Sequence, residues 1–518
     1  MRFTRRQFNC LAASAWAAHL FADRLMALGS GGPADDLTSL TLAQASAKIR
    51  SGTVTATQLT KACLDRIGVY GPKLDCFITV MSEKALAQAK ELDEEQKAGK
   101  LRGPLHGIPI ALKDNIDTAG TRTTAGSAVF EDRVPSEDAP VTARLKAAGA
   151  VIIGKTNLHE FAMGGGDVSF FGPARNPWAL DHTTGGSSSG SGAATSADLC
   201  LGSLGTDTAG SIRNPASYCG IVGIKPTYGL VPIRGIAPLC LSLDHCGPIA
   251  KTVEDAAIML NVLAGYDKLD ITSVEHGRED YVAGMKQPVA GLRLGVPADA
   301  FDGANEEVGR IVQTAIDLLG NATRGVKEVN LPSANDVSYI NFANLGETYA
   351  YHEQFFKLQS TRYQPTDRIR LQAEADGHPR AEDYIRLQWE LETLRRTIDD
   401  AFTDFDLVVM PTQKTTAPAL NDMLKRDMET VAGKPAPSAR SAAGSNVGAY
   451  DAYGIPSITV PCGFSKEGLP VGLMICGPHF SESKVFALAH AYEQATAWHT
   501  RKPVLTPETS VPELITHL

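Results

Sequence analysis

The sequence predicts an α/β fold, and three observations carry that prediction. A helical pattern over "APVTARLKAAGA" runs directly into the buried-strand pattern from Val151 to Ile153. Further short apolar segments, bounded by glycine and proline, are typical of strands in a layered sheet. The chain has 518 residues, 43% of them hydrophobic and 21% charged, which is ordinary for a soluble globular protein with a sizeable core.

Helices open the ordered part of the chain. In "LTLAQASAKIRSGTVTATQLTKACLDRI" apolar residues recur at helical spacing behind serine and threonine starts, and "SEKALAQAKELDEEQKAGK" predicts a second, solvent-exposed helix. The apolar segment Ile108 to Leu112 then predicts a strand that ends at Lys113. This lysine is therefore expected at a strand end.

The second half of the chain continues the α/β pattern. Between about residues 265 and 400, "GLRLGVP" predicts a strand, and "NEEVGRIVQTAIDLLGNA" and "AEDYIRLQWELETLRRTIDDAF" predict helices. Strand-like "DLVVMP", "PSITVPCGF" and "LPVGLMICG" precede a last helix, "SKVFALAHAYEQATAW". Because neither an internal repeat nor an interdomain linker is found, we predict a single domain over residues 30–518.

Residues 1–29 differ from the rest. They combine a basic start, the pair Arg5 and Arg6, and an apolar run from Leu11 to Ala22 that is too short to span a bilayer comfortably. The arginines, followed by Gln7 and Phe8, resemble a twin-arginine signal peptide. We expect export to the periplasm or medium without stable membrane insertion; the alternatives are an uncleaved anchor or a frayed helix, and a cytoplasmic location if the signal is unused.

Charge and cysteine content narrow the function classes. The net charge of −9 and the lack of any run of five basic residues argue against direct nucleic-acid binding. The nine cysteines form no C-x-x-C pair and no metal-ligand spacing with histidine. We therefore expect no metal and no organic cofactor, and we assign no disulfide.

The run "TGGSSSGSG" at residues 184–192 has the composition of a flexible linker. However, it continues without a break in composition into a small-residue helix from about Gly190 and an apolar stretch from Leu199 to Leu204. The run is therefore predicted to belong to packed structure and to a site.

Two familiar catalytic motifs fit this sequence poorly. "GSSSG" at residues 186–190 matches a nucleophile elbow centred on Ser188, but the residues before it include Pro177 and no apolar run where the elbow needs a strand. The histidines that such an elbow could use downstream are His479, His490 and His499. His159 and Glu160 lack the second histidine of a zinc helix.

Six segments in order carry a specific resemblance. They are "GIPIALKDNI", "GAVIIGKTNLHEFAMGG", "GGSSSGSGAA", "GTDTAGSIRNPASYCGIVGIKPTYG", "GIPSITVPCGF" and "GLPVGLMICG". From about residue 35 to 500 the chain resembles the amidase signature family, which includes amidases and the glutamine-hydrolysing component of glutamyl-tRNA amidotransferase. The resemblance implies a large mixed central sheet covered by helices on both faces, with residues 265–400 as a variable, substrate-side region.

The resemblance also implies a Ser-Ser-Lys triad in which Lys113 is the base, Ser187 the bridging serine and Ser211 the acylated nucleophile. The chemistry is consistent with these residue types. A serine hydroxyl needs a base at neutral pH, and lysine can act as one only when burial lowers its pKa from about 10.4. Lys113 would deprotonate Ser187, which deprotonates Ser211, and the reversed relay would protonate the leaving amine.

Residues around the triad have implied roles as well. Four consecutive backbone amides are expected to form the oxyanion hole: Thr208, Ala209, Gly210 and Ser211. Ala209 stands where many family members have glycine, and this departure would narrow the hole.

Other neighbours of the triad are expected to shape the site. Gly185 and Gly186 would permit a cis linkage at Ser187. Met163 and Gly164 resemble the family's loop over the acyl pocket, with an ordinary turn as the alternative. Two flanking residues are expected to form a structural ion pair, Asp207 and Arg213.

The leading hypothesis is an amidohydrolase that cleaves the C–N bond of a small-molecule carboxamide through an acyl-Ser211 intermediate. One alternative is the glutamine-hydrolysing component of a tRNA-dependent amidotransferase, which the same motifs resemble but which an export signal disfavours. Another is a scaffold without activity on the same fold, which the intact Lys113, Ser187 and Ser211 disfavour.

Overall fold

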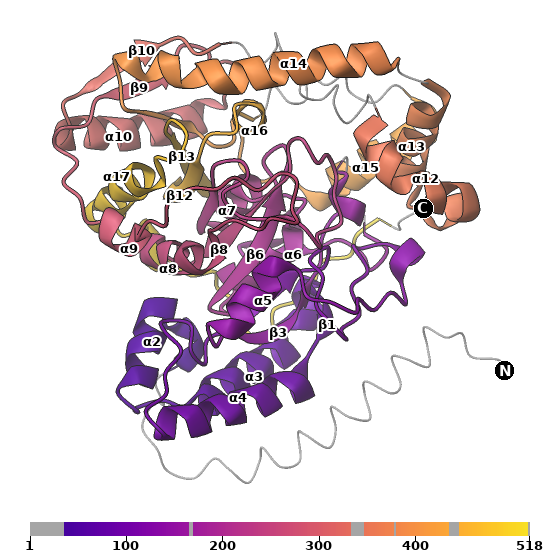
Figure 1. Ribbon diagram of the computed structural model, residues 1–518, viewed down its shortest axis with the longest axis vertical. Helices are drawn as coiled ribbons and strands as arrows, with labels where there is room; N and C mark the ends of the chain where they lie inside the picture. Colours follow the sequence, from indigo (N-terminus) through magenta and orange to yellow (C-terminus); the bar gives the residue numbers. More distant parts are fainter. Residues whose placement is uncertain (1–35, 165–168, 333–345, 378–379, 435–444, 516–518) are drawn as a thin grey trace.

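A mixed sheet of eleven strands runs through the computed structural model, with helices packed around it (Figure 1). The structure describes residues 36–164, 169–332, 346–377, 380–434 and 445–515. The strand order is β1-β3-β2-β6-β8-β7-β12-β13-β11-β9-β10, and β4 and β5 form a separate two-stranded sheet. The predicted large mixed sheet is therefore confirmed, whereas the predicted signal over residues 1–29 lies outside the described residues.

The strands are β1 Phe77–Val80, β2 Pro109–Lys113, β3 Val151–Thr156, β4 Arg175–Asn176, β5 Ala179–Thr183, β6 Gly202–Asp207, β7 Val222–Lys225, β8 His245–Ala250, β9 Leu294–Pro297, β10 Val326–Val329, β11 Leu407–Pro411, β12 Ser457–Phe464 and β13 Pro470–Cys476. The α-helices are α2 Leu42–Arg50, α3 Ala56–Leu74, α4 Ser82–Lys97, α5 Pro140–Ala147, α6 Ser189–Ser196, α7 Arg213–Cys219, α8 Val253–Leu263, α9 Tyr281–Gly284, α10 Glu306–Ala322, α12 Thr348–Gln359, α13 Pro365–Gly377, α14 Ala381–Thr397, α15 Leu420–Val431, α16 Ala449–Ala452 and α17 Glu482–Ala495.

The N-terminal helices begin where their capping residues stand. Thr41 accepts the backbone N–H of Gln44 while the Gln44 side chain binds the Thr41 N–H, and Thr55 and Gln58 repeat this capping box before α3. Each box satisfies backbone donors that the first helical turn leaves free. The serine and threonine starts in the sequence therefore mark the true helix boundaries.

Three neighbouring strands run parallel and bring their carboxyl ends to one edge of the sheet. β2 pairs in parallel with β3 on one side and with β6 on the other. Their last residues are Thr156 in β3, Lys113 in β2 and Asp207 in β6. In parallel sheets this edge is where functional groups gather, so the sheet places Lys113 beside the segments that follow β3 and β6.

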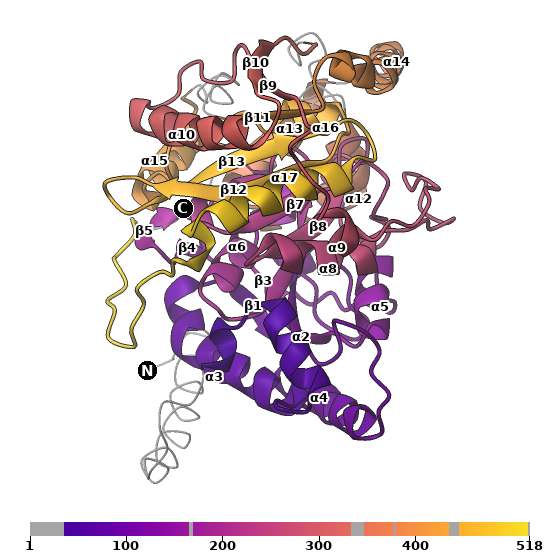
Figure 2. The same cartoon turned by 90° about the vertical axis from the view of Figure 1, so that its left-hand side faces the viewer.

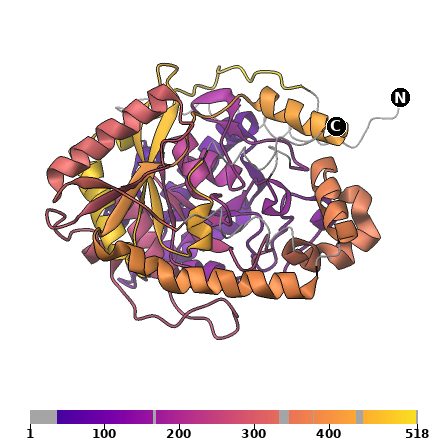
Figure 3. The same cartoon turned by 90° about the horizontal axis from the view of Figure 1, so that it is seen from above.

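Helices cover both faces of the sheet, as the resemblance implied. α8, α10 and α17 pack on one face, and α6 and α7 pack on the other (Figure 2). Seen from above, α12 and α13 lie on the opposite side of the molecule from α10 and α17, and α14 crosses between the two sides (Figure 3). The region predicted to be variable therefore includes helices that stand away from the sheet.

One detail of the strand prediction was wrong. A strand, β5, does precede residues 186–190, where none was expected. Among the described residues it pairs with β4 and forms one bridge from His182 to Ala419, and it is not part of the central sheet. The apolar stretch from Leu199 to Leu204 leads into β6, which begins at Gly202. The eight cysteines in the described ranges are all free and buried. No helix in these ranges is both long and apolar enough to cross a membrane.

Candidate active site

Lys113 is completely buried at the end of β2, and its amine has two hydroxyl partners. Nζ donates to Ser187 Oγ at 2.8 Å and to Thr206 Oγ1 at 2.7 Å. Burial lowers the pKa of Lys113 to about 7, although the charges of Asp207 and Asp244 act in the opposite direction. A substantial fraction of this lysine is therefore neutral near physiological pH, when it can accept a proton.

Ser187 is held by the glycines that precede it. The Gly186–Ser187 peptide bond is cis, as the resemblance implied. A Cβ on Gly186 would lie 2.2 Å from the His159 ring, and one on Gly185, where φ is +71°, would lie 2.3 Å from Asn214 Oδ1. Only glycine fits at either position. The composition that resembles a linker therefore reflects close packing around Ser187.

Ser211 lies beyond the end of β6, and a backbone hydrogen bond ties it to the segment that carries Ser187. The N–H of Ser188 donates to the Ser211 carbonyl at 3.3 Å. Ser211 remains partly exposed, whereas Ser187 and Ser188 are buried. The structure thus brings Lys113, Ser187 and Ser211 to the same edge of the sheet, with Ser211 on the solvent side.

The predicted oxyanion hole needs a correction at Gly210. Its N–H donates to Asp207 Oδ1 at 2.5 Å, so this amide is not free to bind an oxyanion. The amides of Thr208, Ala209 and Ser211 donate to no partner within the described ranges. The Asp207 carboxylate can accept the Gly210 N–H because the chain turns immediately after β6 and brings this N–H back to Asp207.

The Asp207–Arg213 pair expected from the sequence is present and fully buried. Arg213 Nε and Nη2 each lie 3.0 Å from the Asp207 carboxylate, Nη2 also lies 2.5 Å from Asp451, and Nη1 donates to the Val447 carbonyl. The Asp207 carboxylate also accepts the Ile212 N–H at 3.1 Å. Although burial raises the pKa of Asp207, the guanidinium beside it holds that pKa well below the usual range. The ion pair thus fixes the loop that carries Ser211.

Replacing Arg213 by methionine is expected to destabilise the protein by about 3–5 kcal/mol, because it leaves buried carboxylates without their cation. The measurement is the apparent midpoint of thermal unfolding at one heating rate. Arg386→Met is the matched control: Arg386 pairs with Asp383 at the surface, where an ion pair contributes about 0–1 kcal/mol. Equal midpoints for the two variants would contradict this role of Arg213.

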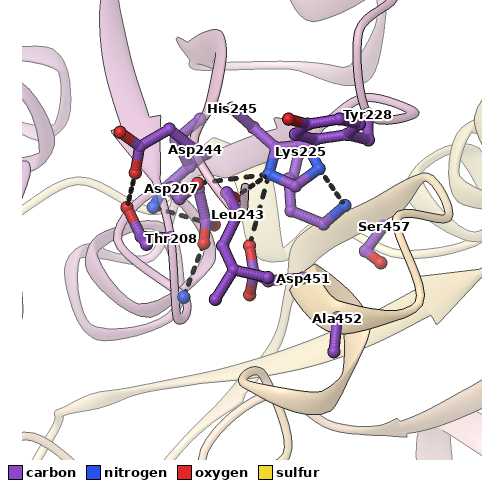
Figure 4. A network of polar contacts seen from close by, with 12 residues as sticks. Asp207, Thr208, Lys225, Tyr228, Leu243, Asp244, His245, Asp451, Ala452 and Ser457 are labelled. Atoms are coloured by element: carbon purple, nitrogen blue, oxygen red, sulfur yellow. Dashed lines mark hydrogen bonds and ion pairs between the residues drawn. The ribbon is translucent and has the colours of Figure 1, made fainter. Parts of the chain in front are cut away.

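A small pocket lies beside Thr206, which is a hydrogen-bond partner of Lys113. It is lined by apolar residues, Ala162, Ile233, Ile236, Ala237 and Leu239, and by polar ones, Asn115, Thr206, Thr208, Asp244 and His245. Asp244 accepts the Thr208 hydroxyl at 2.5 Å, and burial raises its pKa to about 7. Figure 4 shows this contact beside the buried His245, Lys225 and Asp451.

The residues of the rejected motifs have other partners. Ser188 Oγ donates to the Thr206 carbonyl and accepts the Thr206 N–H, and His479 pairs with Asp399. Glu160 is buried and accepts the Gln364 N–H at 2.7 Å. Each side chain therefore has a structural role that explains its place in the fold.

The two residues expected over the acyl pocket, Met163 and Gly164, directly follow a residue that lines it. Met163 is buried with an aromatic cluster that includes Phe130 and Phe161, and Gly164 is exposed with φ of +60°. Their neighbour Ala162 is the one that lines the pocket. Their contact with substrate stays a prediction.

Sequence reasoning missed two members of the site. Thr206 is the second partner of Lys113, and Asp244 holds Thr208. Thr206 lies within the segment "GTDTAGSIRNPASYCGIVGIKPTYG" that carries the resemblance, but only the parallel pairing of β2 with β6 brings it to Lys113. Asp244 directly precedes β8, and no local pattern connects it with Thr208.

Comparison with known proteins gives one consistent result. The Amidase family model matches residues 58–486. The A subunit of the glutamyl-tRNA(Gln) amidotransferase of Roseiflexus sp. (strain RS-1) is 39% identical over 501 residues, covering 91% of this chain and 99% of the relative. The native peptide amidase of Stenotrophomonas maltophilia superposes with a TM-score of 0.75 at 34% identity, over 89% of this chain and 98% of that one. The 6-aminohexanoate cyclic dimer hydrolase gives 0.80 at 25% identity, over 90% and 99%.

Proposed function

The chain belongs to the amidase family, and from that premise we propose that it is an amidohydrolase that cleaves a small-molecule carboxamide through an acyl-Ser211 intermediate. The observation that carries the proposal is the 2.8 Å contact between Lys113 Nζ and Ser187 Oγ, which are both buried. The residue after Ser187, Ser188, donates its backbone N–H to the Ser211 carbonyl and so ties this contact to Ser211. A hydroxyl bridge between a neutral amine and a nearby serine is the arrangement that a proton relay needs.

Thr206 orients the base. It accepts one N–H of Lys113 and also receives an N–H of Asn115, so its oxygen acts as an acceptor. Because a neutral amine has two N–H bonds and one lone pair, this contact turns the lone pair of Lys113 toward Ser187. The Ser187 proton then moves to Nζ while Ser187 Oγ takes the proton of Ser211.

Acylation and deacylation use the same relay. Ser211 Oγ forms a bond to the amide carbon, and the carbonyl π electrons move to oxygen, which the amides of Thr208, Ala209 and Ser211 stabilise. When the C–N bond breaks, the proton on Lys113 returns through Ser187 to the departing nitrogen. Water, deprotonated through the same path, attacks the ester carbon. The bond from this carbon to Ser211 Oγ then breaks, Oγ regains its proton through Ser187, and the carboxylic acid leaves.

A second candidate function is favoured by the relatives. The glutamyl-tRNA(Gln) amidotransferase component described above matches nearly the whole chain at 39% identity. In that role the protein would hydrolyse glutamine beside partner subunits and tRNA, and the proposed absence of a nucleic-acid partner would not hold. The predicted twin-arginine signal at Arg5 and Arg6, which would imply a periplasmic or secreted location, favours the free-standing hydrolase.

Substrate profile, labelling and location test these proposals together. The purified chain alone is expected to release ammonia from simple carboxamides, and a fluorophosphonate is expected to label Ser211. The mature protein is expected outside the cytoplasm, with a new N-terminus near residue 30. Turnover of glutamine alone, together with an uncleaved cytoplasmic chain, would support the amidotransferase role, and a label on Ser188 would contradict the triad.

A further inference from the structure

The segment from His159 to Gly164, here called the 159–164 loop, links the bridging serine to the pocket. The His159 N–H donates to the Ser187 carbonyl at 3.2 Å, and the His159 ring packs against Gly186. Three residues further on, Ala162 lines the pocket. Phe161 and Ala162 have φ of +47° and +61°, which side chains rarely adopt, so surrounding contacts must fix the loop.

Helix α13 and the residue before it supply those contacts. The Gln364 N–H donates to Glu160 Oε2 at 2.7 Å, and Arg370 Nη1 donates to the Met163 carbonyl at 2.8 Å. Between them, the Asp367 carboxyl lies within hydrogen-bonding reach of Glu160. The Phe161 ring meets the His352 ring of α12 at 4.4 Å. The part of the chain with the weakest family resemblance therefore holds one wall of the pocket.

The contact between Asp367 and Glu160 joins two carboxyl groups. Glu160 is fully buried and Asp367 is 5% exposed. Glu160 Oε1 has no donor among the described residues. Two carboxylates offer only acceptors, so they can form a hydrogen bond only when one of them carries a proton.

We propose that Glu160 and Asp367 share one proton, and that this pair holds α13 against the 159–164 loop and so determines which acyl groups the enzyme accepts. The second part rests on the proposed amidase function. Asp367 and Glu160 are positioning residues: they touch no reacting atom but fix the backbone that carries Ala162 and Met163. An acyl group that fills the pocket depends on this wall, whereas a small one does not.

The electrostatics of the pair agree with a shared proton. Burial raises the pKa of Glu160 to about 7, and burial together with the Glu160 charge raises the pKa of Asp367 well above its usual range. The groups that face the pair are the Ser127 hydroxyl, the Gln364 amide, His159, Arg370 and Tyr363. Arg370 and His159 oppose the rise for Asp367, yet burial prevails.

The sign of the pH dependence follows from these shifts. The docked state binds the shared proton more tightly than the undocked state does. Docking is therefore strongest below about pH 4, where exposed carboxyls are protonated as well. It weakens as pH rises from about 4 to about 7 and levels off above that, when the second carboxyl of the docked pair has ionised. Since the two groups titrate together, the transition belongs to the pair.

Hydrogen exchange of the full chain tests the pair without using catalysis. After correction for intrinsic rates, protection of residues 365–377 in the wild type is expected to fall up to tenfold per pH unit between about pH 4 and about pH 7, and to level off above that. Asp367→Asn, which always offers N–H donors to Glu160, is expected to keep its protection across this range. Asp376→Asn is the control, because Asp376 on the same helix is exposed and pairs only with Gln372; it should follow the wild type.

Kinetics then test the consequence for substrates. Asp367→Ala is expected to raise KM at least tenfold for amides of bulky acyl groups and less than twofold for acetamide, with kcat retained, and Asp367→Asn to restore the bulky substrates. Wild-type pH dependence of exchange in Asp367→Asn would overturn the shared proton. An equal rise in KM for both substrates would overturn the role in selectivity. If no amide is hydrolysed at all, the proposed function fails while the exchange result still decides on the pair.

Discussion

Ser211→Ala is expected to lower kcat/KM for amide hydrolysis by about four orders of magnitude or more, while KM for the amide changes little. The reason is that in the proposed mechanism Ser211 makes the new bond to carbon, and no other hydroxyl of the predicted triad can replace it. Ser187 is buried and already bonded to Lys113, whereas Ser211 is the partly exposed member. The measurement is ammonia release, with intact mass after fluorophosphonate treatment as a second readout.

Ser188→Ala is the matched control for that experiment. Ser188 lies in the same serine run, but its hydroxyl is buried between the Thr206 N–H and carbonyl. We expect Ser188→Ala to retain kcat/KM within about tenfold and to be labelled normally, since it loses only structural hydrogen bonds. A Ser211→Ala variant that still forms the adduct or turns over at the wild-type rate would show that another residue is acylated.

Much of the fold could be predicted because the strongest periodic patterns became the expected elements. The amphipathic patterns near residues 306 and 381 became α10 and α14, and the apolar segment before Lys113 became β2. The pattern failed where strands are short or carry glycine and proline. β7 has four residues, and β8 has the sequence "HCGPIA", so neither has the alternation or apolar run that marks a strand.

A resemblance was enough to predict the triad, but it could not predict the residues around the triad. Thr206 meets Lys113 only because β2 and β6 run in parallel, and that pairing depends on the whole strand order and not on any local pattern. The Gly210 amide could not be predicted either, although it lies only three residues from its partner. The sequence shows four consecutive backbone amides, but it does not show the turn that makes the Gly210 N–H donate to Asp207.

The contacts around the 159–164 loop join residues about 200 positions apart. Gln364 is 204 positions from Glu160, and Arg370 is 207 from Met163. In this region the sequence predicted a helix only where apolar residues recur at regular helical spacing. The sequence of α13 has no such spacing, so this helix was not predicted. A pocket wall assembled in this way can vary between relatives while the triad stays the same, because the two are built from separate segments.

Lys113→Met is expected to lower kcat/KM by about three to four orders of magnitude at pH 8 and to change the shape of the pH profile. In the wild type only the neutral amine accepts a proton. With a pKa of about 7, kcat/KM should therefore fall tenfold per pH unit below pH 7 and level off above it. The variant should lack this limb. Lys146 is a partly exposed lysine that pairs with Asp138, and Lys146→Met is the control. It should retain the wild-type kcat/KM and its fall below pH 7.

The same substitution separates loss of chemistry from loss of fold. Because burial lowers the pKa of Lys113 in the folded protein, the unfolded chain binds more protons between about pH 7 and 10.5, and wild-type stability gains from this lysine as pH rises through that window. Below pH 7 the wild type instead buries a charge. Lys113→Met removes that cost, so at pH 6 it should unfold at the wild-type temperature or higher. An inactive variant that melts well below the wild type would assign the loss to the fold and contradict the expected stability. An active variant that retains the limb at pH 7 would remove Lys113 from the role of base.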